Sequence, residues 1–367
     1  MMIYIRRCKK AHYSVRVKGI TIFILLIAIF VKIVRLIRCT VNLKEYVPIC
    51  TGFKDVDIEA RLKISSLDIL PIDVTSEESL PNHGHFRIQR IIHQTWKNRT
   101  IPGSFQPWMR SFWKNHPDWE YRFWTDEASK KIIQETHSYL LPYFGNYSKP
   151  IFRADAIRYV LLYEFGGVYA DIDMKSLRPL DPFIRKYSCF LGQEPHEHPI
   201  IQSNFDGLAC NAFMACKKGH PFMKQLIESL PSFYHFPNML AATGPHFVTV
   251  SYRNYIAANP NIVSMGEYGV YLTPPEYFFP TLDSVKFKIF HNVCRNVNTL
   301  SKLQQWACDS LKRRGYDRTP YAFSFTQHMY YHTYVRIDET KPVDILDLIP
   351  AVILDETDTN VTDDKST

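Results

Sequence analysis

The hydrophobic pattern is most regular in the middle of the chain, where it changes from a helical to a strand period. From residue 152 to 165, apolar side chains recur three and four positions apart, as at Ile157, Val160 and Leu161. The glycine pair at 166–167 can take the left-handed conformation that ends a helix. Residues 168–170 contain strand-forming valine and tyrosine. The pattern therefore predicts a helix, a glycine turn and a short strand that ends just before Asp171.

Strand-like and helix-like segments alternate from residue 90 onward, which is typical of an α/β domain. We expect strands within 91–97 and 115–126, strand and loop at 200–203 and 208–215, and helices at 129–141 and 221–230. The end of the chain is polar and acid-rich, which favours disorder. The predicted organisation is a cytoplasmic tail (1–18), a transmembrane anchor (19–38), a stem (39–87), a catalytic domain (88–335) and a partly disordered C-terminal tail (336–367).

The anchor prediction rests on an apolar run near the N-terminus. The uninterrupted part, residues 20–31, spans about 18 Å as a helix, and residues 17–37 are long enough for a bilayer. Basic residues before the run favour a cytoplasmic N-terminus and a type II orientation. A cleaved signal peptide is the alternative, although no small-residue cleavage site follows. We expect a single-pass protein of the Golgi or endoplasmic reticulum membrane whose catalytic domain is luminal.

Composition is compatible with that location and argues against a nucleic-acid partner. The chain has 367 residues and a formal net charge of +8, with basic residues concentrated before the apolar run and otherwise mixed with acids. Sequons at Asn98, Asn146 and Asn360 could accept glycans in a luminal protein. Five of the eight cysteines lie in the predicted domain, which permits at most two internal disulfides with one thiol left over. No C-x-x-C spacing suggests structural zinc.

The candidate chemistry is concentrated in Asp171-Ile172-Asp173. Residues i and i+2 of a strand point to the same side, so the two carboxylates can face one small volume. Their mutual repulsion is relieved by a hard divalent cation, Mn²⁺ or Mg²⁺, which also leaves room for a diphosphate. Ligand sites of open α/β sheets lie at the carboxyl ends of the strands. The pattern thus indicates an enzyme whose leaving group is a nucleoside diphosphate.

Five ordered segments resemble one family of enzymes. The run from 153 to 183, RADAIRYVLLYEFGGVYADIDMKSLRPLDPF, is similar to the signature of glycosyltransferase family 32, the DXD-containing sugar transferases. That family includes mannosyl-inositol-phosphorylceramide synthases and initiating α-1,6-mannosyltransferases. Segments 91–97, 115–126, 211–222 and 243–247 fit the family in order, and the resemblance covers about residues 88–335. It implies a GT-A-type, Rossmann-like nucleotide-sugar transferase domain.

The resemblance also implies roles for individual residues. Asp173 is expected to contact the metal directly and Asp171 to contact it through water or to hold the donor, while Arg153 and Asp155 contact the donor sugar. Arg158 is expected either to contact phosphate or to pair with Asp155, three residues away. The third metal ligand is expected to be His328, although a structural role is equally open and the family's following Ser-Trp pair is replaced by His332-Thr333. Further expected donor or acceptor contacts are His93, Gln94, Thr95, Trp96, Asn211, Gly244, Pro245 and His246, with core packing as the alternative for Trp96.

The function expected from the resemblance is a retaining, metal-dependent transfer of mannose from GDP-mannose to inositol phosphorylceramide or a similar glycolipid. An α-1,6-mannosyl-, α-1,4-galactosyl- or N-acetylglucosaminyltransferase is the alternative within the family. A haloacid-type phosphatase is a different class, but its aspartate pair should follow an early buried strand, whereas this pair lies in mid-chain. A non-catalytic subunit on the same fold is a third alternative, and a regulatory partner subunit fits either reading.

Overall fold

The computed structural model describes residues 85–203, 206–316, 319–332, 338 and 340–355. The predicted cytoplasmic tail, anchor and stem up to residue 84 lie outside these residues, as does the sequon at Asn360. Within the described ranges, no helix combines the length and the apolar character needed to cross a membrane.

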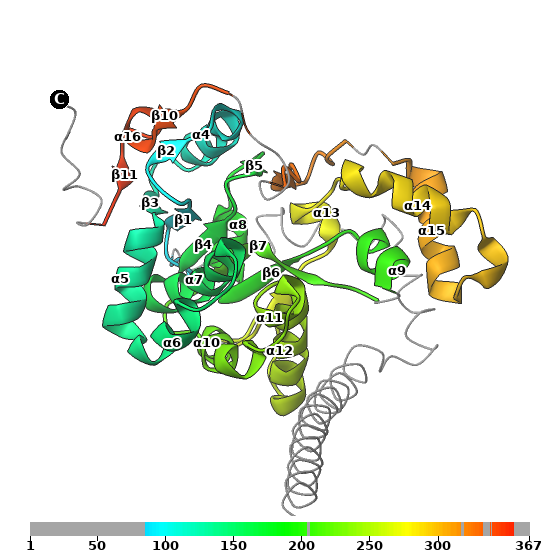
Figure 1. Cartoon of the computed structure of the whole chain (residues 1–367), viewed down its shortest axis with the longest axis horizontal. Helices are drawn as coiled ribbons and strands as arrows, with labels where there is room; N and C mark the ends of the chain where they lie inside the picture. The colour runs from blue at the N-terminus through cyan, green and yellow to red at the C-terminus, as the bar shows by residue number, and fades with distance from the viewer. Residues whose placement is uncertain (1–84, 204–205, 317–318, 333–337, 339, 356–367) are drawn as a thin grey trace, which may run out of the picture. The chain divides into compact units, whose positions relative to one another are not determined.

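A seven-stranded sheet forms the centre of the domain, in agreement with the predicted α/β class (Figure 1). Four neighbouring strands run parallel and two antiparallel pairings follow on the other side of the fourth strand. The spatial order is β11 (Val352–Ile353), β3 (Glu120–Trp124), β1 (Ile91–Thr95), β4 (Gly167–Ala170), β7 (Ala209–Cys216), β6 (Cys189–Gln193) and β8 (Tyr271–Leu272). Because β6 is antiparallel to β7, and β7 to β4, the carboxyl ends of β4 and β6 share one edge of the sheet.

Helices cover the sheet and connect its strands. On one face, α7 (Pro150–Phe165), α10 (Pro221–Phe233) and α12 (Pro245–Ala258) bury a core with the side chains of Tyr169 and Met214. The remaining helices are η3 (Gly103–Phe105), α4 (Gln106–Asn115), α5 (Asp126–Thr136), η4 (Ser138–Leu140), α6 (Leu141–Phe144), α8 (Asp181–Lys186), α9 (Glu197–Ser203), α11 (Met239–Ala242), α13 (Pro275–Phe278), η5 (Ser284–Lys286), α14 (Phe287–Cys294), η6 (Val297–Thr299), α15 (Lys302–Arg314) and α16 (Ile345–Leu348).

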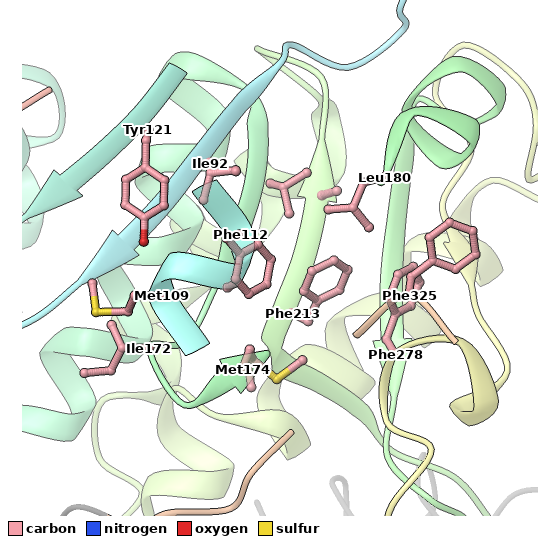
Figure 2. Close-up of a cluster of buried hydrophobic side chains, with 14 of the residues drawn as sticks. Ile92, Met109, Phe112, Tyr121, Ile172, Met174, Leu180, Phe213, Phe278 and Phe325 are labelled. Atoms are coloured by element: carbon pink, nitrogen blue, oxygen red, sulfur yellow. The ribbon is translucent and has the colours of Figure 1, made fainter. Parts of the chain in front are cut away.

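A second core lies under α4 and includes the residue between the two candidate aspartates. Figure 2 shows Ile172 and Met174 in the same cluster as Met109 and Phe112 of α4. Ile172 is 5% exposed, and Met174 is fully buried. Residues 171–174 form a turn and not the end of a strand as predicted, because the Met174 N–H donates to the carbonyl of Asp171 at 2.9 Å. Ile172 points into this core, while Asp171 and Asp173 stay partly exposed.

Two small sheets join distant segments of the chain. β5 (Met174–Ser176) pairs antiparallel with β9 (Thr326–His328), and this register places His328 opposite Met174. β2 (Thr100–Ile101) pairs antiparallel with β10 (Val343–Asp344). The first pairing matters for the site because it brings the C-terminal histidine beside the aspartate pair.

Several predicted elements need correction. Residues 200–203 belong to helix α9, because Ile200 and Ile201 are buried in a cluster with α14 and α15 instead of in the sheet. The helix predicted for 129–141 begins earlier, at Asp126, where the Thr125 side chain accepts the backbone N–H of Ala128. Part of the predicted C-terminal tail also belongs to the domain, since β11 pairs with β3 and Ile345 is fully buried.

The cysteine expectation is confirmed for the predicted domain. Disulfides join Cys189 to Cys216 across the paired strands β6 and β7, and Cys294 to Cys308 between α14 and α15. Cys210 is the thiol left over, and it is buried.

Candidate active site

The predicted helix, glycine turn and strand are present, and both glycines are required. Gly166 caps α7 with φ 68°, and Gly167 begins β4 with φ 105°. A Cβ on Gly167 would lie 2.6 Å from the carbonyl oxygen of Ile91, and one on Gly166 would overlap Gln89. Only glycine therefore lets β4 pair closely with β1 and deliver the aspartates to the sheet edge.

Backbone hydrogen bonds fix the turn that carries the aspartate pair. The N–H of Asp171 donates to the carbonyl of Ala212 at 2.9 Å, and the N–H of Met174 donates to the carbonyl of Asp171 at 2.9 Å. The side-chain amide of Gln94 also donates to the carbonyl of Asp171, at 3.3 Å. The positions of the two carboxylates are thus set by three neighbouring segments of the chain.

Asp171 faces a tyrosine and an arginine. Its Oδ1 accepts the Tyr169 hydroxyl at 2.9 Å and lies 3.3 Å from the Arg158 guanidinium. The Tyr169 hydroxyl is also 2.9 Å from Oγ1 of Thr95, at the end of β1. Burial raises the pKa of Asp171 to about 6; the charge of Arg158 opposes this rise and the charge of Asp173 adds to it. A cation bound beside Asp171 would favour its ionised form and so lower this pKa.

Asp173 faces the C-terminal segment. Its Oδ1 lies 3.2 Å from Nε2 of His328, and its Oδ2 accepts the backbone N–H of Tyr331 at 3.0 Å. Burial alone would raise the pKa of Asp173, but the His328 imidazole and the Tyr331 N–H outweigh it and hold that pKa below its usual value. For His328, burial lowers the pKa, while Asp173 and then Asp171 raise it, with a net rise.

A tight segment, Thr326 to His332, holds His328 against Asp173. Tyr330 and His332 have positive φ values of 49° and 55°, which non-glycine residues adopt at an energetic cost. The Tyr330 hydroxyl donates to the carbonyl of Thr281 at 3.2 Å, and Nε2 of His332 lies 2.9 Å from Oδ2 of Asp283. These contacts offset the strain and lock the histidine at the site.

A buried polar network lies behind Asp171. Arg158 contacts Asp155 at 3.0 Å as well as Asp171, and it donates to the carbonyl of Asn211 at 2.6 Å. Asp155 also accepts the Asn211 amide at 2.9 Å and the Thr243 hydroxyl at 3.0 Å. Burial raises the pKa of Asp155 against the opposing charge of Arg158. The predicted pair of Arg158 with Asp155 is present and extends to Asp171, while the phosphate contact of Arg158 stays a prediction.

Other predicted contacts are distributed around this network. Gly244 precedes α12, and a Cβ there would lie 3.4 Å from Oδ2 of Asp155. Pro245 is the buried first residue of α12, and His246 is half-buried beside it. Burial lowers the pKa of His246, and the charge of Glu194 opposes this. The structure therefore brings Asn211 and the 244–246 turn to the same edge as the aspartates.

Two residues predicted to bind the nucleotide are core residues instead. His93 is fully buried; its Nε2 bonds the carbonyl of Gly166 at 2.8 Å and its Nδ1 accepts the Trp124 indole N–H at 3.1 Å. Burial lowers the pKa of His93 to about 3, so it is neutral. Gln94 is also fully buried and accepts the Tyr121 hydroxyl. Both stabilise the sheet, because β1 lies between β3 and β4.

Thr95 and Trp96 follow at the end of β1 and are half-buried. The Trp96 ring packs against Phe105 at 5.4 Å between centroids, which supports the core alternative. Arg153 is half-buried on α7 and donates to the carbonyl of Tyr147 at 3.1 Å. It is not part of the hydrogen-bonded network of Asp155, so its predicted role in donor binding stays a prediction.

A buried acid that sequence reasoning missed lies at the same edge. Glu194 follows β6, its side chain is 13% exposed, and it contacts His198 at 3.2 Å and Lys286 at 3.9 Å. Burial would raise the pKa of Glu194, but Lys286 and His198, with a smaller effect of His328, lower it to about 2. The available signal was its place at the carboxyl end of a strand, the same signal that identified Asp171.

The donor set suits a hard cation. Asp171 and Asp173 offer carboxylate oxygens and His328 an imidazole, a combination that Mn²⁺ accepts. Nδ1 of His328 is buried without a hydrogen-bond partner, and Nε2 is the ring nitrogen that faces Asp173. Elsewhere in the described ranges, Cys189, Cys216 and His220 come within 4.8 Å of one another, but the two thiols form a disulfide and cannot coordinate.

The region that carries the aspartate pair is similar in sequence to a known family of glycosyltransferases. Residues 102–190, which contain both aspartates, match the family model described as a glycosyltransferase sugar-binding region containing a DXD motif. The predicted resemblance is confirmed. The matched region also contains α7 and β4, the helix and strand that lead to the aspartates.

The chain is similar to three mannosyltransferases of known name. Inositol phosphoceramide mannosyltransferase 3 of Schizosaccharomyces pombe is 34% identical over 188 residues, which is 50% of this chain and 50% of that protein. Mannosyl phosphorylinositol ceramide synthase SUR1 of Saccharomyces cerevisiae is 35% identical over 46% of this chain and 42% of its own length. Initiation-specific alpha-1,6-mannosyltransferase of Candida albicans is 23% identical over 48% of this chain and 54% of its own length. The chain thus spans about half the length of these relatives, and the similarities support a transferase enzyme.

Proposed function

We propose that this protein is a metal-dependent, retaining glycosyltransferase that moves mannose from GDP-mannose to inositol phosphorylceramide or a similar glycolipid. The observation that carries the proposal is the pair Asp171 and Asp173 at the carboxyl end of β4, with His328 at 3.2 Å from Asp173, inside the region that matches the DXD model. The mannosyl donor and the sphingolipid acceptor come from the names of the relatives.

In the proposed reaction, the bond from the sugar C1 to the diphosphate oxygen breaks, a bond from C1 to an acceptor hydroxyl forms, and the hydroxyl proton leaves with the diphosphate. Asp173, Asp171 and His328 are the residues that would hold Mn²⁺ or Mg²⁺. When bound, such an ion supplies charge neutralisation to the departing diphosphate. Arg158 orients Asp171, and the Tyr331 N–H orients Asp173, so both carboxylates are positioned before substrate arrives.

The second candidate is an α-1,6-mannosyltransferase acting on glycans, which the relative from Candida albicans favours. The two candidates share the donor and differ in the acceptor. The predicted membrane anchor and luminal Golgi location fit both, and they remain part of the proposal. Protease treatment of sealed microsomes tests them, because a luminal domain should be protected until detergent is added.

The deciding experiment measures transfer by the purified full chain in detergent. Mannose transfer from GDP-mannose should require Mn²⁺ or Mg²⁺ and an inositol-phosphorylceramide acceptor, and NMR of the product should show retained configuration at C1. Parallel reactions with UDP-galactose or UDP-N-acetylglucosamine in place of GDP-mannose should give no product. Transfer only to a mannose oligosaccharide would replace the first candidate with the second. Metal-independent transfer, or no hydrolysis of any nucleotide sugar, would contradict the proposal.

A further inference from the structure

Positive charge is concentrated in one segment of the described chain. Residues 284–316, which hold η5, α14 and α15, contain seven Lys and Arg residues and one Asp or Glu, Asp309. Residues 85–283 contain 20 basic and 17 acidic residues. The net charge of residues 284–316 is therefore +6 over 33 residues, whereas that of residues 85–283 is only +3 over 199 residues. We call residues 284–316 the basic cap.

The basic cap is a folded unit with its own small core. The Cys294–Cys308 disulfide joins α14 to α15, and the Tyr316 ring stacks on His291 at 4.2 Å between centroids. Phe290 is fully buried in the cluster that also contains Ile200 and Ile201 of α9. Figure 1 shows α14 and α15 side by side at one edge of the domain. The outward side chains of the cap are therefore held in place.

The outward face of η5 and the adjoining α14 combines apolar and cationic side chains. Val285 is 54% exposed and Ile289 is 45% exposed, although both are aliphatic. They lie four positions apart, and the exposed Lys288 and Arg295 continue the same face at helical spacing. On α15, the exposed basic residues are Lys302, Lys312 and Arg313, of which Lys312 lies 3.4 Å from Asp309.

We propose that the basic cap docks on the surface of an anionic lipid bilayer. Lysine and arginine on this face would contact lipid phosphates, while Val285 and Ile289 would enter the boundary between headgroups and acyl chains. Exposed aliphatic residues distinguish this surface from a nucleic-acid site, where aromatic stacking or polar base contacts accompany the charge. A short path connects the cap to the candidate active site, because Lys286 of η5 lies 3.9 Å from Glu194.

Docking in this way would hold the carboxyl edge of the sheet close to the membrane. The proposal concerns a surface outside the candidate active site and does not depend on the transfer reaction. Its test accordingly uses binding alone, and a protein that proves to have another activity could still dock as described.

The experiment is hydrogen–deuterium exchange of the full chain in lipid nanodiscs, one set with neutral phosphatidylcholine alone and one in which phosphatidylserine supplies the anionic charge. Peptides covering 284–296 should exchange more slowly in the anionic discs, while peptides from α5 and α10 should not change. Each basic residue near an anionic surface strengthens binding about fivefold. Lys288→Glu with Arg295→Glu should therefore abolish the protection, and Val285→Ser with Ile289→Ser should reduce it.

The matched control is Val263→Ser with Lys224→Glu, which removes an apolar residue, 71% exposed, and an exposed lysine elsewhere on the domain. It should keep full protection of 284–296. Thermal unfolding should show that all three variants fold. The proposal is overturned if exchange in 284–296 is equal in neutral and anionic discs, if protection survives in the Lys288 and Arg295 variant, or if a DNA duplex protects this segment and anionic discs do not.

Discussion

Arg158 provides the sharpest test of how the site is built. Its side chain is 3% exposed and contacts two carboxylates, of Asp155 at 3.0 Å and Asp171 at 3.3 Å. It also donates to the carbonyls of Asn211 at 2.6 Å and Ala154 at 3.1 Å. Arg158→Met keeps much of the apolar stem and removes the charge. The Asp155 carboxylate, 7% exposed, then loses its counter-ion in the protein interior.

Removing one partner of a buried ion pair costs about 3–5 kcal/mol, because the remaining charge is buried without compensation. For a domain of this size, 1 kcal/mol shifts the melting temperature by about 2–4 °C. We therefore expect Arg158→Met to lower the melting temperature by about 6–20 °C. The melting temperature of Arg158→Lys should lie between those of Arg158→Met and the wild type, since one ammonium group cannot reach all four oxygens that Arg158 contacts. Arg122→Met is the matched surface control, and its pair with Glu120 should contribute about 1 kcal/mol or less.

The assay is thermal unfolding of the full chain in detergent with EDTA and no nucleotide. Asp155→Asn in the Arg158→Met background removes the unpaired buried carboxylate. The double variant should therefore recover at least half of the fall in melting temperature. A melting temperature within about 2 °C of wild type for Arg158→Met, together with lost nucleotide binding, would refute the ion-pair reading. Arg158 would then act mainly as a phosphate ligand.

Three further predictions concern the site carboxylates and Arg153. Asp173→Asn should reduce metal-dependent transfer by roughly a hundredfold or more, measured as initial rates across Mn²⁺ concentrations, and an unchanged rate and metal dependence would exclude Asp173 as a ligand. The raised pKa of Asp171 should stabilise the metal-free protein below pH 3.8, and this contribution of about 1–3 kcal/mol should disappear as the pH rises through about 6. Asp171→Asn should abolish that pH dependence in melting curves with EDTA. Arg153→Lys should lower kcat/KM by about tenfold with little change in melting temperature, and full activity would assign Arg153 a structural role.

The helix, turn and strand around the aspartates could be predicted because their signals are local. Helical spacing, a glycine pair and strand-forming residues follow one another within 20 residues, and the tight approach of Gly167 to β1 explains why glycine occupies that position. The α/β class followed from the same alternation along the chain. The prediction of at most two disulfides and one remaining thiol in the domain was also confirmed, since it depends only on the number of cysteines.

The errors involve information that only the folded chain contains. His93 and Gln94 resembled exposed strand-end residues, but the strands on both sides of β1 bury them. Ile200 and Ile201 are adjacent apolar residues, a pattern shared by short strands and buried helices. The two-residue strand β11 is defined by pairing with β3, more than 220 residues earlier, and has no local signature. The pKa of Glu194 is lowered by Lys286, which lies 92 residues later in the sequence.

The pairing of β5 with β9 also sets the order in which the site can form during synthesis. Met174 and His328 are opposite each other in this pairing although 154 residues separate them, so the contact has a high sequence separation. A nascent chain of 300 residues already contains both aspartates, the glycine pair and Arg158, but it lacks the histidine and the Tyr331 N–H that hold Asp173. The segment that carries the aspartates can therefore fold while translation continues, and the contacts that hold Asp173 are complete only when the last tenth of the chain is available.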